Sequence, residues 1–254
     1  MKDIKIIVAT HKPYRMPESD IFIPIQVGAS GKETRLGFDT DDSGDNISAK
    51  NPYYCELTAL YWAWKNLDAD YIGLSHYRRH FIMNKAKDKW QRIIDRDFIE
   101  TRLDSTDIIL PKPRNYYIET SYNQYIHAHH KEDLDFTRNI INEKFPSYIP
   151  AYDKAMNSTK GHRFNMFIMK REYFDEYSKW LFDILFELEK RLDISSYSTN
   201  DQRVFGFVSE RLLDVWINTN KYTYVELPVQ YMENQNWFVK GGAFLKRKFI
   251  GKKQ

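Results

Sequence analysis

Short apolar runs rich in β-branched residues alternate with amphipathic helical segments along most of this chain, and this order limits its fold more than any other feature. The apolar runs predict strands at residues 3–9, 21–27, 71–75, 107–110, 163–169 and 222–227. The segments with helical periodicity lie at residues 51–67, 88–103, 121–145, 148–157, 171–192 and 202–218. This alternation predicts an α/β fold, in which a mostly parallel central sheet carries helices on both faces.

The sequence predicts one domain followed by a basic tail. The chain has 254 residues, enough for one large α/β domain, and no linker rich in Pro, Gly or Ser divides it. We expect the domain to cover residues 1–230. The tail, residues 231–254, has six Lys or Arg residues and no acidic residue from Lys240 onward, interleaved with Phe, Leu and Ile. Such a segment either lies on an anionic membrane surface or is a solvated terminus.

Charge and cysteine content exclude several classes of protein. The formal net charge of +3 argues against a nucleic-acid partner. The single cysteine, Cys55, excludes a disulfide framework and a cysteine-rich metal site. The first residues lack the apolar length of a secretory signal, and no apolar run approaches the roughly 18 residues of a membrane span. We therefore expect a cytoplasmic protein, with peripheral attachment to the inner face of the plasma membrane as a second option.

The most informative motif is the hexapeptide Ser75–His80, which reads Ser-His-Tyr-Arg-Arg-His and begins at the end of a predicted strand. In open α/β sheets, ligands bind outside the carboxyl ends of strands. Guanidinium groups at that place favour an anionic ligand, most simply a phosphate or diphosphate. Since successive strand residues point to opposite faces, we expect at least one of Arg78 and Arg79 to bind substrate and the other to pair structurally. His76 either donates a hydrogen bond to phosphate or is a structural histidine.

A second cluster contains His127, His129 and His130, within the helix predicted at 121–145. His127 and His130 are expected to share one face of that helix. Three roles stay open for this cluster: contact with substrate, ligation of a metal, or a structural role. We predict substrate contact for His127 and His130.

Two polar positions late in the chain are candidates for binding and catalysis. Asn165 enters a strand that is otherwise apolar, so its amide either caps local backbone or faces the site. Asp201 precedes a helix that begins near Gln202, where it is either an N-cap or a general base acting on a sugar hydroxyl. Glu210 lies within that helix, and we expect it to pair with a surface cation such as Arg211.

No sequence pattern places a metal ion well. Gly-rich phosphate loops and zinc-ligand spacings are absent from the sequence. Asp68-Ala-Asp70 looks like the acidic pair that holds a divalent ion in many sugar-nucleotide enzymes, but it precedes its strand and so belongs at the end of the sheet opposite the ligand. The acidic residues between Asp39 and Asp45 are a weaker alternative. We assign no metal ligand, and Mn²⁺ or Mg²⁺ stays an option without a well-placed acidic pair.

Longer motifs resemble a bacterial family of capsule and exopolysaccharide glycosyltransferases that was long labelled a domain of unknown function. They are Asp45-Asn-Ile-Ser48, residues 51–65, Gly73-Leu-Ser-His-Tyr-Arg-Arg79, His127-Ala-His-His130, Phe164-Asn-Met-Phe-Ile-Met169 and residues 203–212. The resemblance implies a GT-A-like, that is Rossmann-like, domain that uses a nucleotide-activated sugar, in particular a uridine diphosphate (UDP) sugar. It also implies transfer of galactose or galactofuranose to a lipid-linked oligosaccharide, in capsule, exopolysaccharide or O-antigen synthesis.

Within this interpretation, one group of residues binds the nucleotide end of the donor. Thr10, His11 and Lys12, at the end of the first strand, would border the nucleotide. Arg78 and Arg79 would offset the charge of the diphosphate, because a guanidinium is permanently charged and presents a fixed fork of donors.

A second group would act on the sugar. Asn165 and Gln202 are expected to orient it. Asp201 would either deprotonate the acceptor, which gives inversion, or stabilise positive charge at the anomeric carbon. The alternative from another class is a non-catalytic polysaccharide-binding or assembly protein, which would bind saccharide without nucleotide. A single-stranded nucleic-acid binder is disfavoured by the even charge balance.

Overall fold

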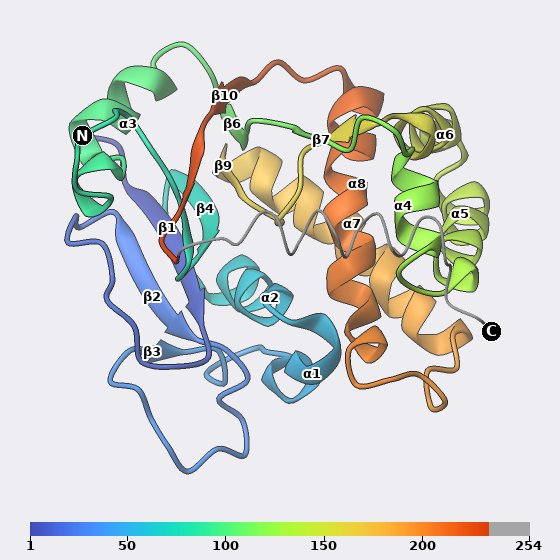
Figure 1. The fold of residues 1–254 in the computed structure, drawn as a ribbon. Coiled ribbons are helices and arrows are strands. Elements are labelled where there is room, and N and C mark those ends of the chain that lie inside the picture. The colour runs from blue at the N-terminus through green and yellow to red at the C-terminus, as the bar shows by residue number, and fades with distance from the viewer. Residues whose placement is uncertain (234–254) are drawn as a thin grey trace.

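The computed structural model describes residues 1–233, and in this part of the chain a nine-stranded sheet forms the centre (Figure 1). Its strands are β1 (Ile4–Thr10), β2 (Phe22–Gln26), β3 (Asp39–Thr40), β4 (Tyr71–His76), β5 (Arg79–Phe81), β6 (Ile108–Pro111), β9 (Phe167–Lys170), β10 (Val225–Leu227) and β11 (Val229–Tyr231). Seven of them lie in the order β10-β6-β9-β4-β1-β2-β3, while β5 pairs with β4 and β11. A separate pair consists of β7 (Arg114–Asn115) and β8 (Lys160–Gly161).

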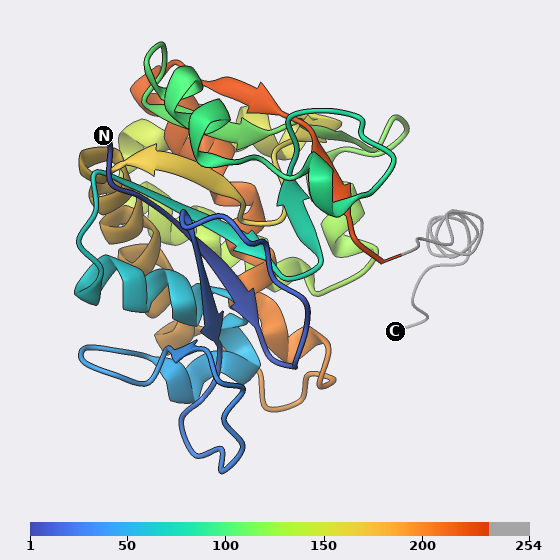
Figure 2. The ribbon, with the colours of Figure 1, turned by 90° about the vertical axis from the view of Figure 1, so that its left-hand side faces the viewer.

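Helices connect these strands and cover the sheet. The α-helices are α1 (Asn51–Tyr54), α2 (Leu57–Asn66), α3 (Arg96–Leu103), α4 (Ser121–Ile126), α5 (Lys131–Lys144), α6 (Ile149–Asn157), α7 (Arg171–Arg191) and α8 (Val204–Asn220). Short 3-10 helices lie at Ser48–Lys50, Trp90–Arg92, Pro146–Tyr148 and Asp201–Arg203. In Figure 2, α3, β1 and β2 lie on the side that faces the viewer, and α8 lies behind the sheet.

β1 contributes side chains to two separate cores, one on each face of the sheet. Ile7 and Ala9 belong to the larger core, together with residues of α2 and of α5 to α8. Ile4, Ile6 and Val8 belong to the smaller core, together with residues of α3. This alternation follows from the period of two in a strand. The expectation of helices on both faces is therefore confirmed.

The sheet is mostly parallel, as predicted. β4, β1, β2 and β3 form one parallel set, and β6 is parallel to β10. Only β9 runs antiparallel to both of its neighbours in the main strand order, β4 and β6. β9 approaches β4 closely at Gly73, where an added Cβ would lie 2.9 Å from the carbonyl oxygen of Phe167. The predicted α/β fold with a mostly parallel central sheet is confirmed.

β9 is shorter than the strand predicted at 163–169. Phe164 and Asn165 have φ values of 77° and 53°, which belong to the left-handed region and not to extended backbone. The strand therefore begins only at Phe167. The chain makes a tight turn before β9, and this turn determines where the Asn165 side chain lies.

Three predicted helices differ from the observed ones. The helix predicted at 51–67 is broken at Cys55, where a φ of 54° separates α1 from α2. The helix predicted at 88–103 becomes regular only after Asp95, whose carboxylate accepts a hydrogen bond from the backbone N–H of Phe98 as the N-cap of α3. The helix predicted at 121–145 is α4 and α5. His127 lies at the end of α4 and His130 at the start of α5, so the prediction that they share one helix face is wrong.

The basic hexapeptide forms a β-hairpin. β4 ends at His76, Tyr77 and Arg78 form the turn, and β5 begins at Arg79. β5 pairs on its other side with β11, where Arg79 lies opposite Tyr231. β5 and β11 have three residues each, too few to show the period of a strand, so the sequence does not predict them.

Two expectations concern membranes and the tail. Within residues 1–233, no helix has both the length and the apolar character needed to cross a bilayer. Tyr231 belongs to β11 and so to the sheet. Of the predicted basic tail, residues 234–254 lie outside the described residues.

Candidate active site

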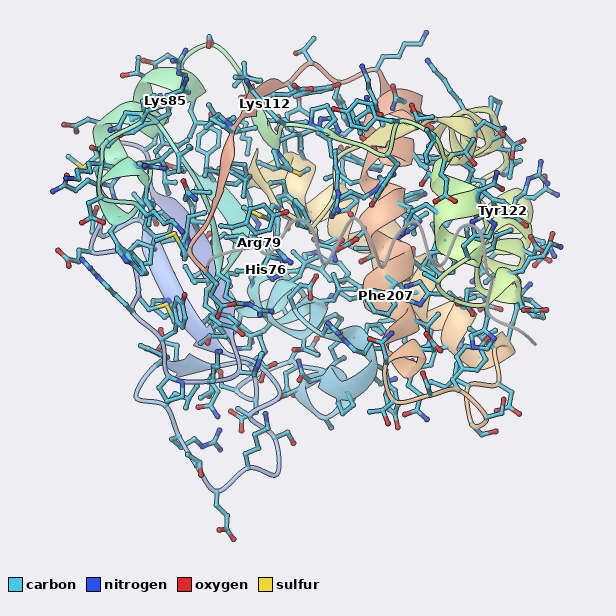
Figure 3. All side chains as sticks on the ribbon, viewed as in Figure 1. His76, Arg79, Lys85, Lys112, Tyr122 and Phe207 are labelled. Atoms are coloured by element: carbon cyan, nitrogen blue, oxygen red, sulfur yellow. The ribbon has the colours of Figure 1, made fainter. Side chains whose placement is uncertain are left out.

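A cavity of about 540 Å³ lies at the carboxyl ends of β1 and β4. Its walls come from the ends of β1 and β2, the break between α1 and α2, the β4–β5 hairpin and the start of α8. Figure 3 shows His76 and Arg79 close together at the end of β4, with Phe207 on α8. All three line the cavity. The hexapeptide therefore opens into a cavity at the end of the sheet that the sequence predicts for ligand binding.

The cavity contains three guanidinium groups, of which Arg79 is the most informative. The Arg79 guanidinium carbon lies 4.6 Å from the ring centroid of Phe164 and 5.6 Å from that of Tyr231. Its Nε is buried and has no hydrogen-bond partner, and the residues 1–233 provide no carboxylate within ion-pair distance. A permanent cation held by aromatic rings, without a counter-ion among the described residues, is available to an anionic ligand.

Arg78 lies at the rim of the same cavity. Its guanidinium is 3.3 Å from a carboxylate oxygen of Glu233, and its side chain is 43% exposed. The Lys12 ammonium lies 3.7 Å from the other oxygen of Glu233. Both arginines of the hexapeptide line the cavity, because Arg78 is in the hairpin turn and escapes the alternation of a strand. The hairpin therefore explains why both side chains line the cavity. That at least one of them binds substrate stays a prediction.

Arg203 enters the cavity from the start of α8. Its Nε donates a hydrogen bond of 3.1 Å to the sulfur of Cys55, and its guanidinium carbon lies 5.2 Å from the Phe207 ring centroid. Burial raises the pKa of the Cys55 thiol to about 11, so this sulfur is a neutral thiol at pH 7. The positive charge of Arg203 is therefore not neutralised by a thiolate.

Two carboxylates, Glu56 and Glu210, also line the cavity. Asn165 Nδ2 donates a hydrogen bond of 2.7 Å to Glu56 Oε1 and a longer one of 3.3 Å to the carbonyl oxygen of Gly206. Ser209 Oγ donates to the Asn165 Oδ1 at 2.9 Å. The amide is thus fixed on both sides, and it positions the Glu56 carboxylate.

His76 lies beside this carboxylate and is uncharged. Its Nε2 is 2.6 Å from the carbonyl oxygen of Phe164 and 3.9 Å from Glu56 Oε1. Because a carbonyl oxygen can only accept, the ring proton is on Nε2 and the lone pair is on Nδ1. Burial lowers the pKa of His76, which keeps the ring neutral near pH 7. His76 can therefore accept a hydrogen bond from a ligand hydroxyl through Nδ1.

The residues predicted to border the nucleotide are placed in different ways. His11 lines the cavity, and burial together with the charges of Arg78 and Lys12 lowers its pKa. Lys12 is exposed at the rim, where it contacts Glu233. Thr10 is buried, and its hydroxyl donates a hydrogen bond of 2.7 Å to the carbonyl oxygen of Lys12. Thr10 therefore shapes the turn that carries the other two.

Asp201, predicted as the catalytic residue, lies outside the set of residues that line the cavity. It is 4% exposed, accepts a hydrogen bond of 2.8 Å from Ser198 Oγ, and lies 3.0 Å from His129 Nδ1. His130 Nε2 is 3.7 Å from the same carboxylate. The His129 ring stacks on Phe207 at 4.3 Å, so Asp201 is linked to the cavity through two rings.

Three other residues predicted to bind substrate, Gln202, His127 and Asn165, also lie outside the set that lines the main cavity. Gln202 lines a different cavity, beside Tyr53 and Glu189. His127 Nδ1 lies 2.8 Å from Glu119, away from the three arginines. Asn165 does not line the main cavity itself, but it reaches the cavity through its hydrogen bond to Glu56.

The acidic residues weighed as metal ligands have other surroundings. Asp41 is fully buried, and its carboxylate accepts hydrogen bonds from two backbone N–H groups and from the hydroxyls of Ser48 and Thr58. Asp68 and Asp70 lie at the start of β4, at the opposite end of the sheet from the main cavity. Residues 1–233 contain no group of three or more His, Cys, Asp or Glu residues placed to hold a metal.

Sequence reasoning missed four residues of the cavity: Glu56, Arg203, Phe207 and Glu210. Arg203 is the N-cap of α8, and Phe207 and Glu210 follow within that helix at steps of four and three, which places the three residues on one face. This spacing could have predicted that the three side chains lie together. The expectation that Glu210 pairs with a surface cation is wrong, because Glu210 lines the cavity. Glu56 gave no such signal, because its position depends on the helix break at Cys55.

Comparisons with known proteins identify the family of this chain and a solved structure with a similar fold. The family model described as a domain of unknown function, DUF4422, matches residues 5–221. The apo structure of the bifunctional glycosyltransferase WbbM is similar with a TM-score of 0.84 and 31% sequence identity, over 91% of this chain and 46% of that chain. This chain thus spans just under half the length of that solved chain. None of the curated proteins matches. The α/β fold predicted from sequence is confirmed as one that matches a glycosyltransferase.

Proposed function

This chain belongs to the DUF4422 family, and from the contents of its cavity we propose that it is a glycosyltransferase that uses a nucleotide-sugar donor. One observation carries the proposal: the guanidiniums of Arg78, Arg79 and Arg203 line the same cavity as the carboxylates of Glu56 and Glu210. Cations for a diphosphate and carboxylates for a sugar are the groups that this reaction needs side by side.

The arginines fit the diphosphate of the donor. During glycosyl transfer, the bond between the anomeric carbon and the phosphate oxygen breaks, and negative charge grows on the leaving nucleoside diphosphate. Arg79 is held in place by Phe164 and Tyr231 before the ligand arrives, so little ordering is required on binding. The volume of about 540 Å³ lies within the usual range of small-ligand sites.

The likeness to WbbM supports glycosyl transfer as the reaction class, because 91% of this chain is covered at 31% identity. The finer assignment comes from the motifs of the sequence. We expect the donor to be a UDP-sugar that carries galactose or galactofuranose. We expect the acceptor to be a lipid-linked oligosaccharide of capsule, exopolysaccharide or O-antigen synthesis, met at the inner face of the membrane.

A donor screen tests the proposed function. The protein is incubated with UDP-galactose, UDP-galactofuranose and other nucleotide sugars, and the released nucleoside diphosphate is measured with and without a chelator. The proposal expects release from at least one donor, and the chelator arm decides whether a divalent ion takes part. Absence of release from every donor, together with no thermal stabilisation by millimolar UDP, would favour a polysaccharide-binding protein instead.

A further inference from the structure

We propose that Glu56 is the general base of this site, the group that takes the proton from the acceptor hydroxyl. This inference rests on the proposed glycosyltransferase function and adds to it the residue that carries the proton. Its starting point is the placement of one carboxylate, held at one oxygen and open at the other, in the cavity that contains the three arginines.

The two oxygens of Glu56 have different surroundings. Oε1 accepts the hydrogen bond of 2.7 Å from Asn165 Nδ2. In the described part of the chain, no group is hydrogen-bonded to Oε2. The Glu56 side chain is 14% exposed, and it lines the cavity. A general base needs this arrangement, because one oxygen must be fixed in space while the other keeps a lone pair for the incoming proton.

Backbone strain occurs at two residues that position Glu56, namely its hydrogen-bond partner and the residue before it in the chain. Asn165 has a φ of 53°, and Cys55, directly before Glu56, has a φ of 54°. Non-glycine residues rarely adopt this left-handed backbone, and they keep it where the surrounding structure imposes it. Ser209 Oγ and the carbonyl oxygen of Gly206 fix the amide orientation of Asn165. Two strained positions far apart in the chain thus converge on one carboxylate.

Two other carboxylates could compete for this role. Glu210 lines the cavity, but within residues 1–233 no donor orients its carboxylate. Asp201 is oriented by Ser198 and lies beside His129, but it is 4% exposed and lies outside the cavity lining. Glu56 alone among the three is both oriented and part of the cavity wall.

The step balances as a single displacement. The acceptor hydroxyl loses its proton to Glu56 Oε2 as its oxygen forms a bond to the anomeric carbon of the donor. The bond from that carbon to the phosphate oxygen breaks, and the electron pair leaves with the nucleoside diphosphate, whose charge the arginines offset. The proton then passes from Glu56 to solvent. Attack from the face opposite the leaving group inverts the configuration of the sugar.

Glu56→Gln tests the assignment, because it removes the basic oxygen and changes the size of the side chain little. The control is Glu18→Gln, whose carboxylate is 86% exposed on a loop. Turnover is measured with UDP-galactofuranose or UDP-galactose and a panel of octyl glycosides as acceptors. UDP affinity is measured by calorimetry, and folding by circular dichroism.

We expect Glu56→Gln to lower kcat at least about 100-fold, with UDP affinity within about twofold of the unsubstituted protein. Glu18→Gln should leave both unchanged. Should Glu56→Gln fail to fold, Glu56→Asp keeps the carboxylate but withdraws it by one methylene, and a fall in kcat without a change in UDP affinity is expected. Product sugar should have inverted configuration by NMR.

Several results would overturn the inference. A Glu56→Gln protein that folds and turns over at the normal rate would remove Glu56 as the base, as would a product with retained configuration. If Asp201→Asn or Glu210→Gln lost kcat while Glu56→Gln did not, the base would lie there. In these cases the unsubstituted protein still releases nucleotide, so the proposed function survives. Loss of both UDP binding and release in the unsubstituted protein would overturn the function and this inference together.

Discussion

Asn165 donates a hydrogen bond of 2.7 Å from its side-chain amide to the Glu56 carboxylate, across 109 residues of sequence. The bond joins the turn before β9 to the break between α1 and α2. It therefore ties the antiparallel strand of the sheet to the wall of the cavity. If this contact positions a reacting carboxylate, its loss must affect turnover more than donor binding.

Asn165→Asp is the sharpest change at this contact, because it preserves size and tolerates a positive φ but places a second negative charge against Glu56. We expect kcat to fall about tenfold or more, with the KM for donor changed far less. The matched control is Asn157→Asp, an exposed position at the end of α6. Steady-state kinetics measure kcat and KM for both variants. An Asn165→Asp protein with normal kcat would contradict the positioning role.

Arg78→Ala tests the charge at the rim of the cavity. The side chain is 43% exposed and lies in a hairpin turn, so its removal should leave the fold intact. We expect kcat/KM to fall at least about tenfold, since a charge-assisted hydrogen bond to phosphate contributes roughly 1.5–3 kcal/mol. Turnover at subsaturating donor measures the effect. Unchanged kcat/KM would mean that Arg78 serves only its ion pair with Glu233.

Asp41→Asn tests whether the acidic loop is a structural element. Asp41 is fully buried and accepts four hydrogen bonds, among them those from the Gly28 and Ala29 N–H groups. An amide there turns N–H groups toward donors, so we expect the free energy of unfolding in urea to fall by roughly 3 kcal/mol. Asp39→Asn, at an exposed position nearby, should change it by less than about 0.5 kcal/mol. Equal effects of the two changes would argue against this role.

His80→Phe tests the stability of the hairpin at low pH. His80 is fully buried between the rings of Phe22 and Trp90, and burial lowers its pKa from 6.5 to about 4. Between pH 6.5 and about pH 4, His80 is protonated in the unfolded chain but stays neutral in the folded chain. The free energy of unfolding therefore falls as the pH decreases through this window. The shift corresponds to about 3 kcal/mol. Urea unfolding at pH 7 and pH 4.5 should show a smaller loss in His80→Phe than in the unsubstituted protein, and equal losses would contradict the account.

The sequence was sufficient to predict the sheet and the end of it that carries the site, for physical reasons. The run at 71–75 is long enough and apolar enough to be a buried strand, and β4 lies there. The residues after it had to lie at the carboxyl edge of a parallel sheet, where the cavity is. The period of the helix predicted at 171–192 was equally clear, and α7 covers Arg171–Arg191.

The parts that could not be predicted depend on single backbone angles and on distant contacts. Cys55, Phe164 and Asn165 adopt positive φ without being glycine, which no sequence period indicates. These turns break a helix, shorten a strand and bring Asn165 to Glu56. The pairing of β5 with β11 joins segments that are about 150 residues apart and three residues long. Local propensity has no information on such contacts.

The account depends most on Arg79, and a calorimetric titration with UDP tests it directly. Arg79→Met keeps the apolar stem against Phe164 and removes the charge, while Arg102→Met, an exposed arginine 5.0 Å from the Phe98 ring, is the matched control. The account predicts that the unsubstituted protein and Arg102→Met bind UDP alike and that Arg79→Met binds at least about tenfold more weakly. Equal UDP affinity in all three proteins would contradict a diphosphate site at the end of β4.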